Sequence, residues 1–152
     1  MTEDKTTRRT IVCAGISGAI AVIMGSFAAH GLEEYLSSSD PSGPFLLKRL
    51  RQFDVAVRYH LIHSVALLAL SSVRIGSPNR RRWVARLFLT GLILFSGSLY
   101  LLVLTNTPKL GAITPLGGLS WIVGWLLLLW MVRPVGDANL TTLDQERSTE
   151  AS

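Results

Sequence analysis

LFLTGLILFSGSLYLLVLTNT, residues 87–107, is a run of twenty-one residues without a charged side chain. A helix needs about 20 residues to cross the roughly 30 Å hydrocarbon core of a bilayer, so this segment is long enough to span a membrane. Two further uncharged runs meet the same requirement, residues 10–29 and residues 110–132. The pattern therefore predicts an integral membrane protein.

A fourth span is less regular, because the uncharged run at residues 61–73 is too short by itself. It reaches spanning length only if it begins near Val55 and includes Arg58, His60 and His63. Polar and ionisable residues are rare inside a membrane-spanning helix, so these three are candidates for a structural or functional role.

Together the four runs predict an all-α, integral membrane four-helix bundle. We expect an N-terminal segment at residues 1–9, a transmembrane domain at 10–133 and a disordered tail at 134–152, with helices at about 10–30, 55–74, 84–106 and 112–132. Residues 45–53 mix apolar and basic residues at helical spacing, so we expect them to lie along the membrane surface. A cleaved signal peptide is the alternative for the first run, which is longer than the apolar core of such signals.

Basic residues indicate the orientation. Four crossings place the N-terminus, the loop between the second and third helices and the C-terminus on one side. That side carries Lys5, Arg8, Arg9, Arg74, Arg80, Arg81, Arg82, Arg86 and Arg133, against Lys48, Arg49, Arg51, Arg58 and Lys109 on the other. Since cytoplasmic flanks are enriched in Lys and Arg, we expect a protein of the inner or plasma membrane with both termini in the cytoplasm.

The net charge of +5 comes from basic residues at the helix ends, which membrane topology explains. We therefore expect no nucleic-acid partner. Arg80, Arg81 and Arg82 follow turn residues in the cytoplasmic loop, so the bilayer and its anionic headgroups are their expected partners. The lone cysteine, Cys13, lies inside the first span and has no internal partner for a disulfide.

Small residues indicate where the helices meet, because helices in lipid associate through close contact and hydrogen bonds. Ala14, Gly18, Ala21, Gly25 and Ala28 form one stripe along the first helix. We expect helix packing at Gly18, Gly25, Gly97, Gly117 and Gly118. The bulky residues of the last helix, Trp121, Trp125 and Trp130, are expected to meet lipid.

The remaining polar residues are predicted to gather near the outer boundary of the membrane, in an outward-facing pocket lined by His30, Tyr59, His63, Tyr100 and Thr114. The alternative for each histidine is structural, since a neutral imidazole that donates to a carbonyl can hold two helices together. No His-x-x-x-His pair, phosphate loop or nucleophile elbow is present, so we predict no metal site, cofactor or catalytic residue.

Four ordered motifs carry a resemblance to one family. They read GSFAAHGL at residues 25–32, FDVAVRYHLIH at 53–63, LFSGSLY at 94–100 and AITPLGG at 112–118. The chain resembles the family called domain of unknown function 423, whose animal members are known as transmembrane protein 256. The resemblance implies a four-helix inner or plasma membrane protein and supplies no activity, ligand or cofactor.

These observations favour a small binding, accessory or scaffold subunit with an outward-facing polar pocket. The alternative is a transporter or channel for a proton, ion or small solute that works as an oligomer, with histidine as its switch. An intramembrane enzyme has the least support, because no nucleophile and base can be paired. A second copy of the chain or another membrane protein is the expected protein partner.

Overall fold

A computed structural model describes residues 2–39, 45–73 and 76–131 of the chain. Every regular element within these residues is a helix: α1 (Thr2–His30), α2 (Leu32–Ser39), α3 (Leu46–Ser72), α4 (Pro78–Gly91), the π-helix η1 (Leu92–Gly97), α5 (Ser98–Thr105), the 3₁₀-helix η2 (Pro108–Ala112) and α6 (Thr114–Met131). Four helical segments are long and apolar enough to cross a membrane, namely Lys5–His30, Leu46–Ser72, Pro78–Thr105 and Pro108–Met131. The predicted all-α four-helix membrane bundle is therefore confirmed.

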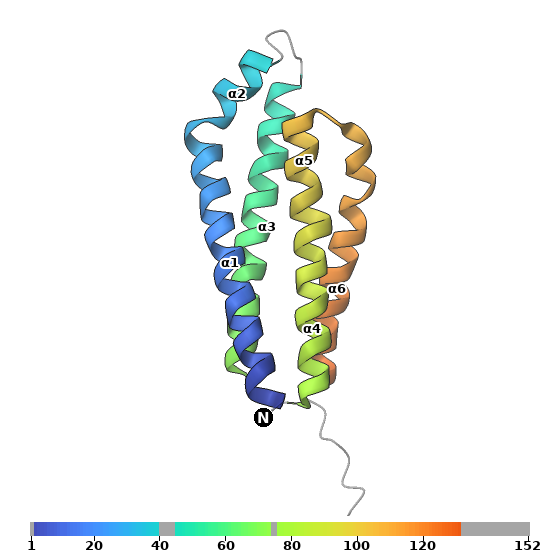
Figure 1. Cartoon of the computed structure of the whole chain (residues 1–152). Coiled ribbons are helices and arrows are strands. Elements are labelled where there is room, and N and C mark those ends of the chain that lie inside the picture. The colour runs from blue at the N-terminus through green and yellow to red at the C-terminus, as the bar shows by residue number, and fades with distance from the viewer. Residues whose placement is uncertain (1, 40–44, 74–75, 132–152) are drawn as a thin grey trace, which may run out of the picture.

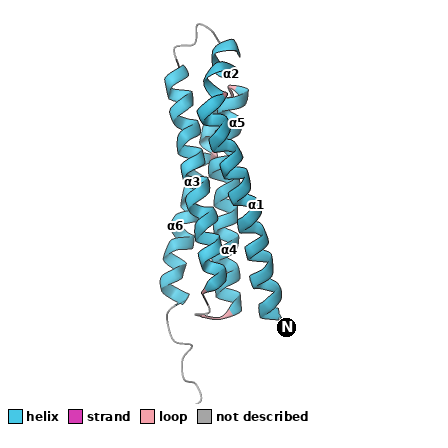
Figure 2. Cartoon of the chain, turned by 90° about the vertical axis from the view of Figure 1, so that its left-hand side faces the viewer, coloured by secondary structure: helices cyan, strands magenta, loops and turns pink. Residues whose placement is uncertain are grey.

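The four long segments run side by side and alternate in direction (Figure 1). α1 packs along α3 and α4 packs along α6, while α3 joins the two pairs through η1 and α5. The view in Figure 2, turned by 90° about the vertical axis, shows that the axes of these segments are roughly aligned over their length. α1 begins and α6 ends at the same end of the bundle, opposite α2, as an even number of crossings requires.

α3 begins at Leu46, nine residues before the expected start of the second span. The expectation that residues 45–53 lie along the membrane surface is therefore wrong. Phe53 is fully buried, and the almost fully buried Arg49 donates from Nη2 to the carbonyl of Val103 in α5. These contacts hold the first turns of α3 against the bundle. The expected tail at 134–152 lies outside the described residues, as do Arg74 and Arg133.

The small-residue stripe of α1 faces α3. Ala14 and Ala21 are 4% and 2% exposed. A methyl group added at Gly18 would come within 4.0 Å of the Ser64 side chain, and one at Gly25 within 3.3 Å of Val57. Small side chains therefore let the α1 and α3 backbones approach each other closely, as helices in lipid require.

Gly117 brings α6 against the π-helix η1. A methyl group at Gly117 would lie 2.3 Å from the backbone nitrogen of Phe95, whereas one at Gly118 would meet only the Phe95 ring, at 3.7 Å. Gly97 is placed differently, since the atom nearest to an added methyl group is the Leu92 carbonyl oxygen of η1 itself, at 3.8 Å. Of these three glycines, Gly117 is the one whose lack of a side chain the packing requires.

Candidate functional site

His60 occupies the centre of a buried chain of hydrogen bonds that joins three helices. Its Nε2 atom is 3.0 Å from Oγ of Ser17 in α1, and its Nδ1 atom is 3.2 Å from the hydroxyl of Tyr100 in α5. Ser17 Oγ is also 2.7 Å from Ser64 Oγ, which donates to the His60 carbonyl at 2.8 Å. All four residues are no more than 8% exposed.

This chain, which we call the His60 chain, lies near the middle of the membrane. Ser17 is eight residues beyond Arg9 and thirteen before His30, or about 12 Å and 20 Å along a helix. Tyr100, which was expected to line a pocket near the outer boundary, therefore bonds to a group at this depth. At that depth no water is at hand to satisfy an unpaired polar group, so each donor needs a protein partner.

The chemistry of the partners fixes the direction of each hydrogen bond. The Ser64 hydroxyl must donate to the His60 carbonyl, because a carbonyl oxygen only accepts, and the Ser17 hydroxyl therefore donates to Ser64. Ser17 then accepts from His60 Nε2–H, and Nδ1 of the neutral imidazole accepts from the Tyr100 hydroxyl. Every donor is used once, and the chain ends at a backbone carbonyl.

His63, three residues along α3, is held by aromatic rings. Its ring stacks on Trp121 of α6 with centroids 3.7 Å apart and planes within 5°. Trp125 Nε1 donates to His63 Nε2 at 3.2 Å, so His63 Nδ1 carries the proton and donates to the Tyr59 carbonyl at 2.9 Å. Trp121 Nε1 donates to the Phe88 carbonyl at 3.0 Å. Both nitrogens of His63 are therefore in use.

The position of Trp121 corrects the expectation that this residue meets lipid. Trp121 is 3% exposed, whereas Trp125 and Trp130 are 46% and 42% exposed. Since lipid tails are as apolar as leucine side chains, burial in the bundle is decided by contact and hydrogen bonding rather than by hydrophobicity. Trp121 offers both, through its stack on His63 and its bond to Phe88.

The residues expected to line one outward-facing pocket are placed at several different locations. Tyr100 belongs to the His60 chain, whereas Tyr59 and His63 belong to the aromatic cluster against α6. Thr114 Oγ1 is 2.9 Å from Ser98 Oγ, where α6 begins. The helical period explains the separation, because Tyr59 and His60 are adjacent on α3 and point about 100° apart.

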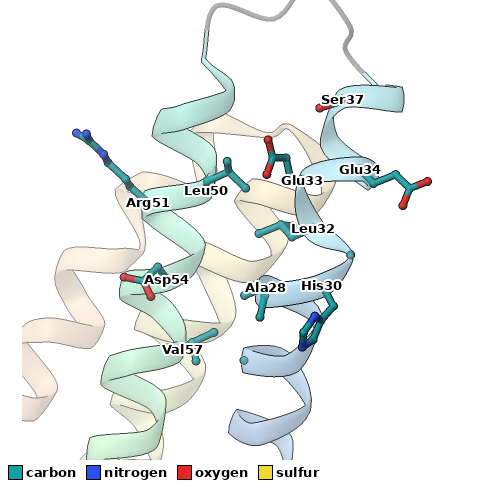
Figure 3. Close-up of a pocket in the computed structure, with 13 residues that line it drawn as sticks. Ala28, His30, Leu32, Glu33, Glu34, Ser37, Leu50, Arg51, Asp54 and Val57 are labelled. Carbon is teal, nitrogen blue, oxygen red and sulfur yellow. The ribbon is translucent and has the colours of Figure 1, made fainter.

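His30, the fifth expected residue, is exposed and lines a separate cavity of about 780 Å³ between α1, α2 and α3. In Figure 3, Glu33 points toward α3, whereas Glu34 and Arg51 point outward. Asp54 also lines this cavity, and its carboxylate pairs with the exposed Arg58 one turn along α3. Among the described residues, no group of three His, Cys, Asp or Glu side chains is placed to hold a metal ion.

A second cavity, the lateral groove, lies between α1 and the third membrane-spanning segment, which α4, η1 and α5 form together and which we call the third rod. It has a volume of about 580 Å³ and its floor is formed by Ser17, His60 and Tyr100. Its rims include Ile16 and Ile93, which are 58% and 71% exposed, so the groove opens sideways toward lipid. The floor is closed by the His60 chain, and the walls are apolar.

Sequence reasoning left His60 out of the predicted pocket and missed Ser17 and Ser64, although both serines carried a signal. Ser64 follows His60 by four residues and so shares its helix face. Ser17 is three residues after Ala14 and four before Ala21, which places it on the small-residue stripe that packs against α3. What the sequence did not indicate was that these two faces meet at the same depth.

Comparisons with known proteins agree with the resemblance drawn from the motifs. The family described as protein of unknown function (DUF423) matches residues 24–118. The UPF0382 membrane protein of Staphylococcus saprophyticus is 39% identical over 119 residues, covering 78% of this chain and 92% of that protein. UPF0382 membrane protein YwdK of Bacillus subtilis is 39% identical over 124 residues, covering 78% and 91%.

A more distant relative shows the same extent of similarity. The UPF0382 membrane protein of Haemophilus influenzae is 32% identical over 120 residues, which cover 79% of this chain and 90% of that protein. No solved structure matches the chain. The matched region includes the end of α1, all of α3 and the third rod, and the start of α6. The chain therefore belongs to the DUF423 family, to whose UPF0382 membrane proteins it is similar over most of its length.

Proposed function

We propose that the protein is a small binding or accessory subunit of the cell membrane that holds a hydrophobic molecule in the lateral groove. Both termini lie in the cytoplasm in this proposal, as the basic residues at that end of the bundle favour. The observation that carries it is a groove with apolar walls that opens to the bilayer and leaves no polar atom of its floor unmatched.

The shape and chemistry of the groove suit an acyl or other hydrocarbon chain. Between Leu89 and Leu101 its wall extends over twelve residues of the third rod, or about 18 Å. Half of a hydrocarbon core of roughly 30 Å is of similar length. An acyl chain of that length can therefore lie along this part of the wall, and Leu110 and Ile113 extend the groove toward the end of the bundle where α6 begins.

The hydrogen bonds of the interior support binding over transport. The His60 chain runs from Tyr100 through Ser17 and Ser64 to a backbone carbonyl, where no further acceptor continues it. His63 likewise has a partner on each nitrogen. A relay histidine needs a ring nitrogen that can exchange partners, whereas these two are arranged as joints between helices.

An accessory role would use the outer faces of α1 and α6, the two spans with the smallest buried share. Ile23 on α1 and Leu129 on α6 are 63% and 69% exposed. A second copy or another membrane protein would pack there without disturbing the His60 chain, because neither face contributes to it.

Photolabelling tests the groove. Phosphatidylcholine with a diazirine in its acyl chain, reconstituted with the protein in vesicles, should label the groove wall around Ile93 more than the α6 face around Ile122. Gly97→Leu should lower that labelling several-fold, since Gly97 lines the groove and its nearest neighbour leaves space for a side chain. The peptides are identified by mass spectrometry.

Gly15→Leu is the matched control, because Gly15 has nothing within 4 Å and does not line the groove. It introduces the same side chain into a membrane-spanning helix and should leave the labelling unchanged. Uniform labelling of both faces, or equal loss in the two variants, would show that the groove holds no molecule.

A further inference from the structure

The lateral groove adjoins a third cavity, the inner cleft, between the start of α1 and the first turns of α4. The inner cleft has a volume of about 460 Å³. Cys13 and Leu89 line both cavities, so the groove and the cleft are neighbours along one seam. Figure 1 shows α1 and α4 beginning at the same end of the bundle. A single elongated molecule that passes along Cys13 and Leu89 would reach both cavities.

The inner cleft is basic. Lys5, Arg9, Arg82 and Arg86 line it, and the described residues that line it include no Asp or Glu. Lys5, Arg9 and Arg86 are exposed. Four cations around one cleft repel each other unless an anion lies between them, so the charge pattern is complementary to a phosphate group.

Arg82 is held toward α1 by its own contacts. Its Nε donates to Thr6 Oγ1 at 2.9 Å and its Nη1 donates to Asn79 Oδ1 at 3.3 Å. A guanidinium has five N–H donors, so these two bonds orient the group and leave others for a ligand. The pre-oriented guanidinium lowers the entropy cost of binding a phosphate.

The neighbouring arginines serve the bundle instead. Arg80 donates to the Trp130 carbonyl at 3.1 Å and lies over the Trp130 ring at 4.4 Å. Arg81 is 6% exposed and donates to the Val73 carbonyl at 3.1 Å. The three arginines that the sequence groups together are therefore divided by the helix period, and Arg82 is the one that lines the inner cleft.

We propose that the inner cleft binds the phosphate headgroup of an anionic phospholipid of the cytoplasmic leaflet, whose acyl chain lies in the lateral groove. The inference rests on the proposed function and names the ligand class. A basic pocket between membrane helices on the cytoplasmic side is the chemistry by which anionic headgroups are recognised. A lipid suits the seam better than free phosphate, because only a lipid fills the apolar groove beyond Cys13 and Leu89.

The test compares two photoreactive lipids with the same acyl-chain diazirine, phosphatidylglycerol and phosphatidylcholine, in vesicles that contain the full chain. Phosphatidylglycerol should label peptides around Cys13 and Leu89 at least tenfold more. Arg9→Gln with Arg86→Gln should abolish this preference, since each basic residue near an anionic surface contributes about fivefold in affinity. Arg9→Lys with Arg86→Lys should restore most of it.

Lys48→Gln with Arg51→Gln is the control, because it removes the same charge at the opposite end of the bundle. It should leave the preference intact, and thermal unfolding verifies that all variants are folded. Equal labelling by the two lipids overturns the inference but leaves the proposed function standing, whereas no groove labelling by either lipid removes both. A preference that survives the Arg9 and Arg86 changes, or that millimolar inorganic phosphate abolishes, also overturns the inference.

Discussion

His60 and His63 are three residues apart on α3 and are held in different ways. His60 faces α1 and α5, where the Ser17 and Tyr100 hydroxyls bond its ring nitrogens, while Ser64 of α3 itself donates to its carbonyl. His63 faces α6, where a stacked indole covers its ring and a second indole donates to it. α3 thus joins α1 and α5 by hydrogen bonds between polar side chains and joins α6 mainly by aromatic contact.

The difference teaches which contacts tolerate change. The His60 chain consists of donors that each have one acceptor, so removing a member orphans a polar atom in the middle of the bilayer. The His63 cluster gains most of its energy from ring contact, which any flat ring of similar size can supply. Replacing a histidine by another flat ring should therefore lower the free energy of unfolding more on the His60 side of α3 than on the His63 side.

The largest loss of stability is expected when the Trp121 ring is removed from the cluster around His63. Trp121→Ala removes a ring that is 3% exposed and stacked on His63. It should lower the free energy of unfolding by about 3 kcal/mol, because it leaves a cavity in the bundle. Unfolding in mixed micelles with increasing dodecyl sulfate measures this. Trp83→Ala, at a residue 54% exposed, is the control and should change stability by less than about 1 kcal/mol. Similar losses in both variants would contradict the assignment of Trp121 to the core.

The next effect concerns the close approach that places α6 against η1. Gly117→Ala puts a methyl group 2.3 Å from the backbone nitrogen of Phe95 and should cost about 2–3 kcal/mol, because two backbones must separate. Gly118→Ala is the matched control, with its methyl group at 3.7 Å from the Phe95 ring. A Gly117 variant as stable as the Gly118 variant would mean that α6 does not touch η1.

A direct comparison of the two histidines follows. His60→Phe orphans the buried hydroxyl of Tyr100 and should cost about 1–2 kcal/mol. His63→Phe keeps the stack on Trp121 and loses one bond from the half-exposed Trp125, so it should cost less than about 1 kcal/mol. The two variants are compared in the same unfolding assay. The reverse order would show that the hydroxyl chain is the weaker joint.

The smallest effect is the coupling inside the His60 chain. A double-mutant cycle of Ser17→Ala and His60→Phe should give an interaction energy of about 0.6 kcal/mol, the average for hydrogen bonds between membrane helices. The same cycle with Ser120→Ala, a residue that bonds Leu87 and lies outside the chain, should give none. A coupling of zero in the first cycle would mean that Ser17 and His60 do not share a hydrogen bond.

Much of the fold could be predicted from the sequence. Three uncharged runs long enough to span the bilayer, with a fourth that includes Arg58, predicted four crossings. The stripe through Gly18 and Gly25 predicted the face of α1 that meets α3. The start of α3 did not follow, because the basic residues of 45–53 look like a surface segment until the Val103 carbonyl is available to Arg49. That partner lies 54 residues away in the chain.

The candidate site was harder to predict. Tyr100 and His63 were both expected in one pocket, yet each joins a different cluster, since side chains on adjacent faces of α3 meet different helices. The helical repeat of about 3.6 residues per turn predicts which residues share a face of one helix. It does not tell which face of another helix lies opposite, or at what depth.

The sequence by itself determined that this chain crosses a membrane four times and belongs to its family, because the cost of placing charge in hydrocarbon acts on each segment separately. Only the tertiary structure decided that Ser17 meets His60, that Arg82 rather than Arg80 lines the inner cleft, and that a groove runs between α1 and the third rod. These features depend on how helices rotate and slide against each other. In lipid that choice rests on small differences in contact and hydrogen bonding, which no single segment contains.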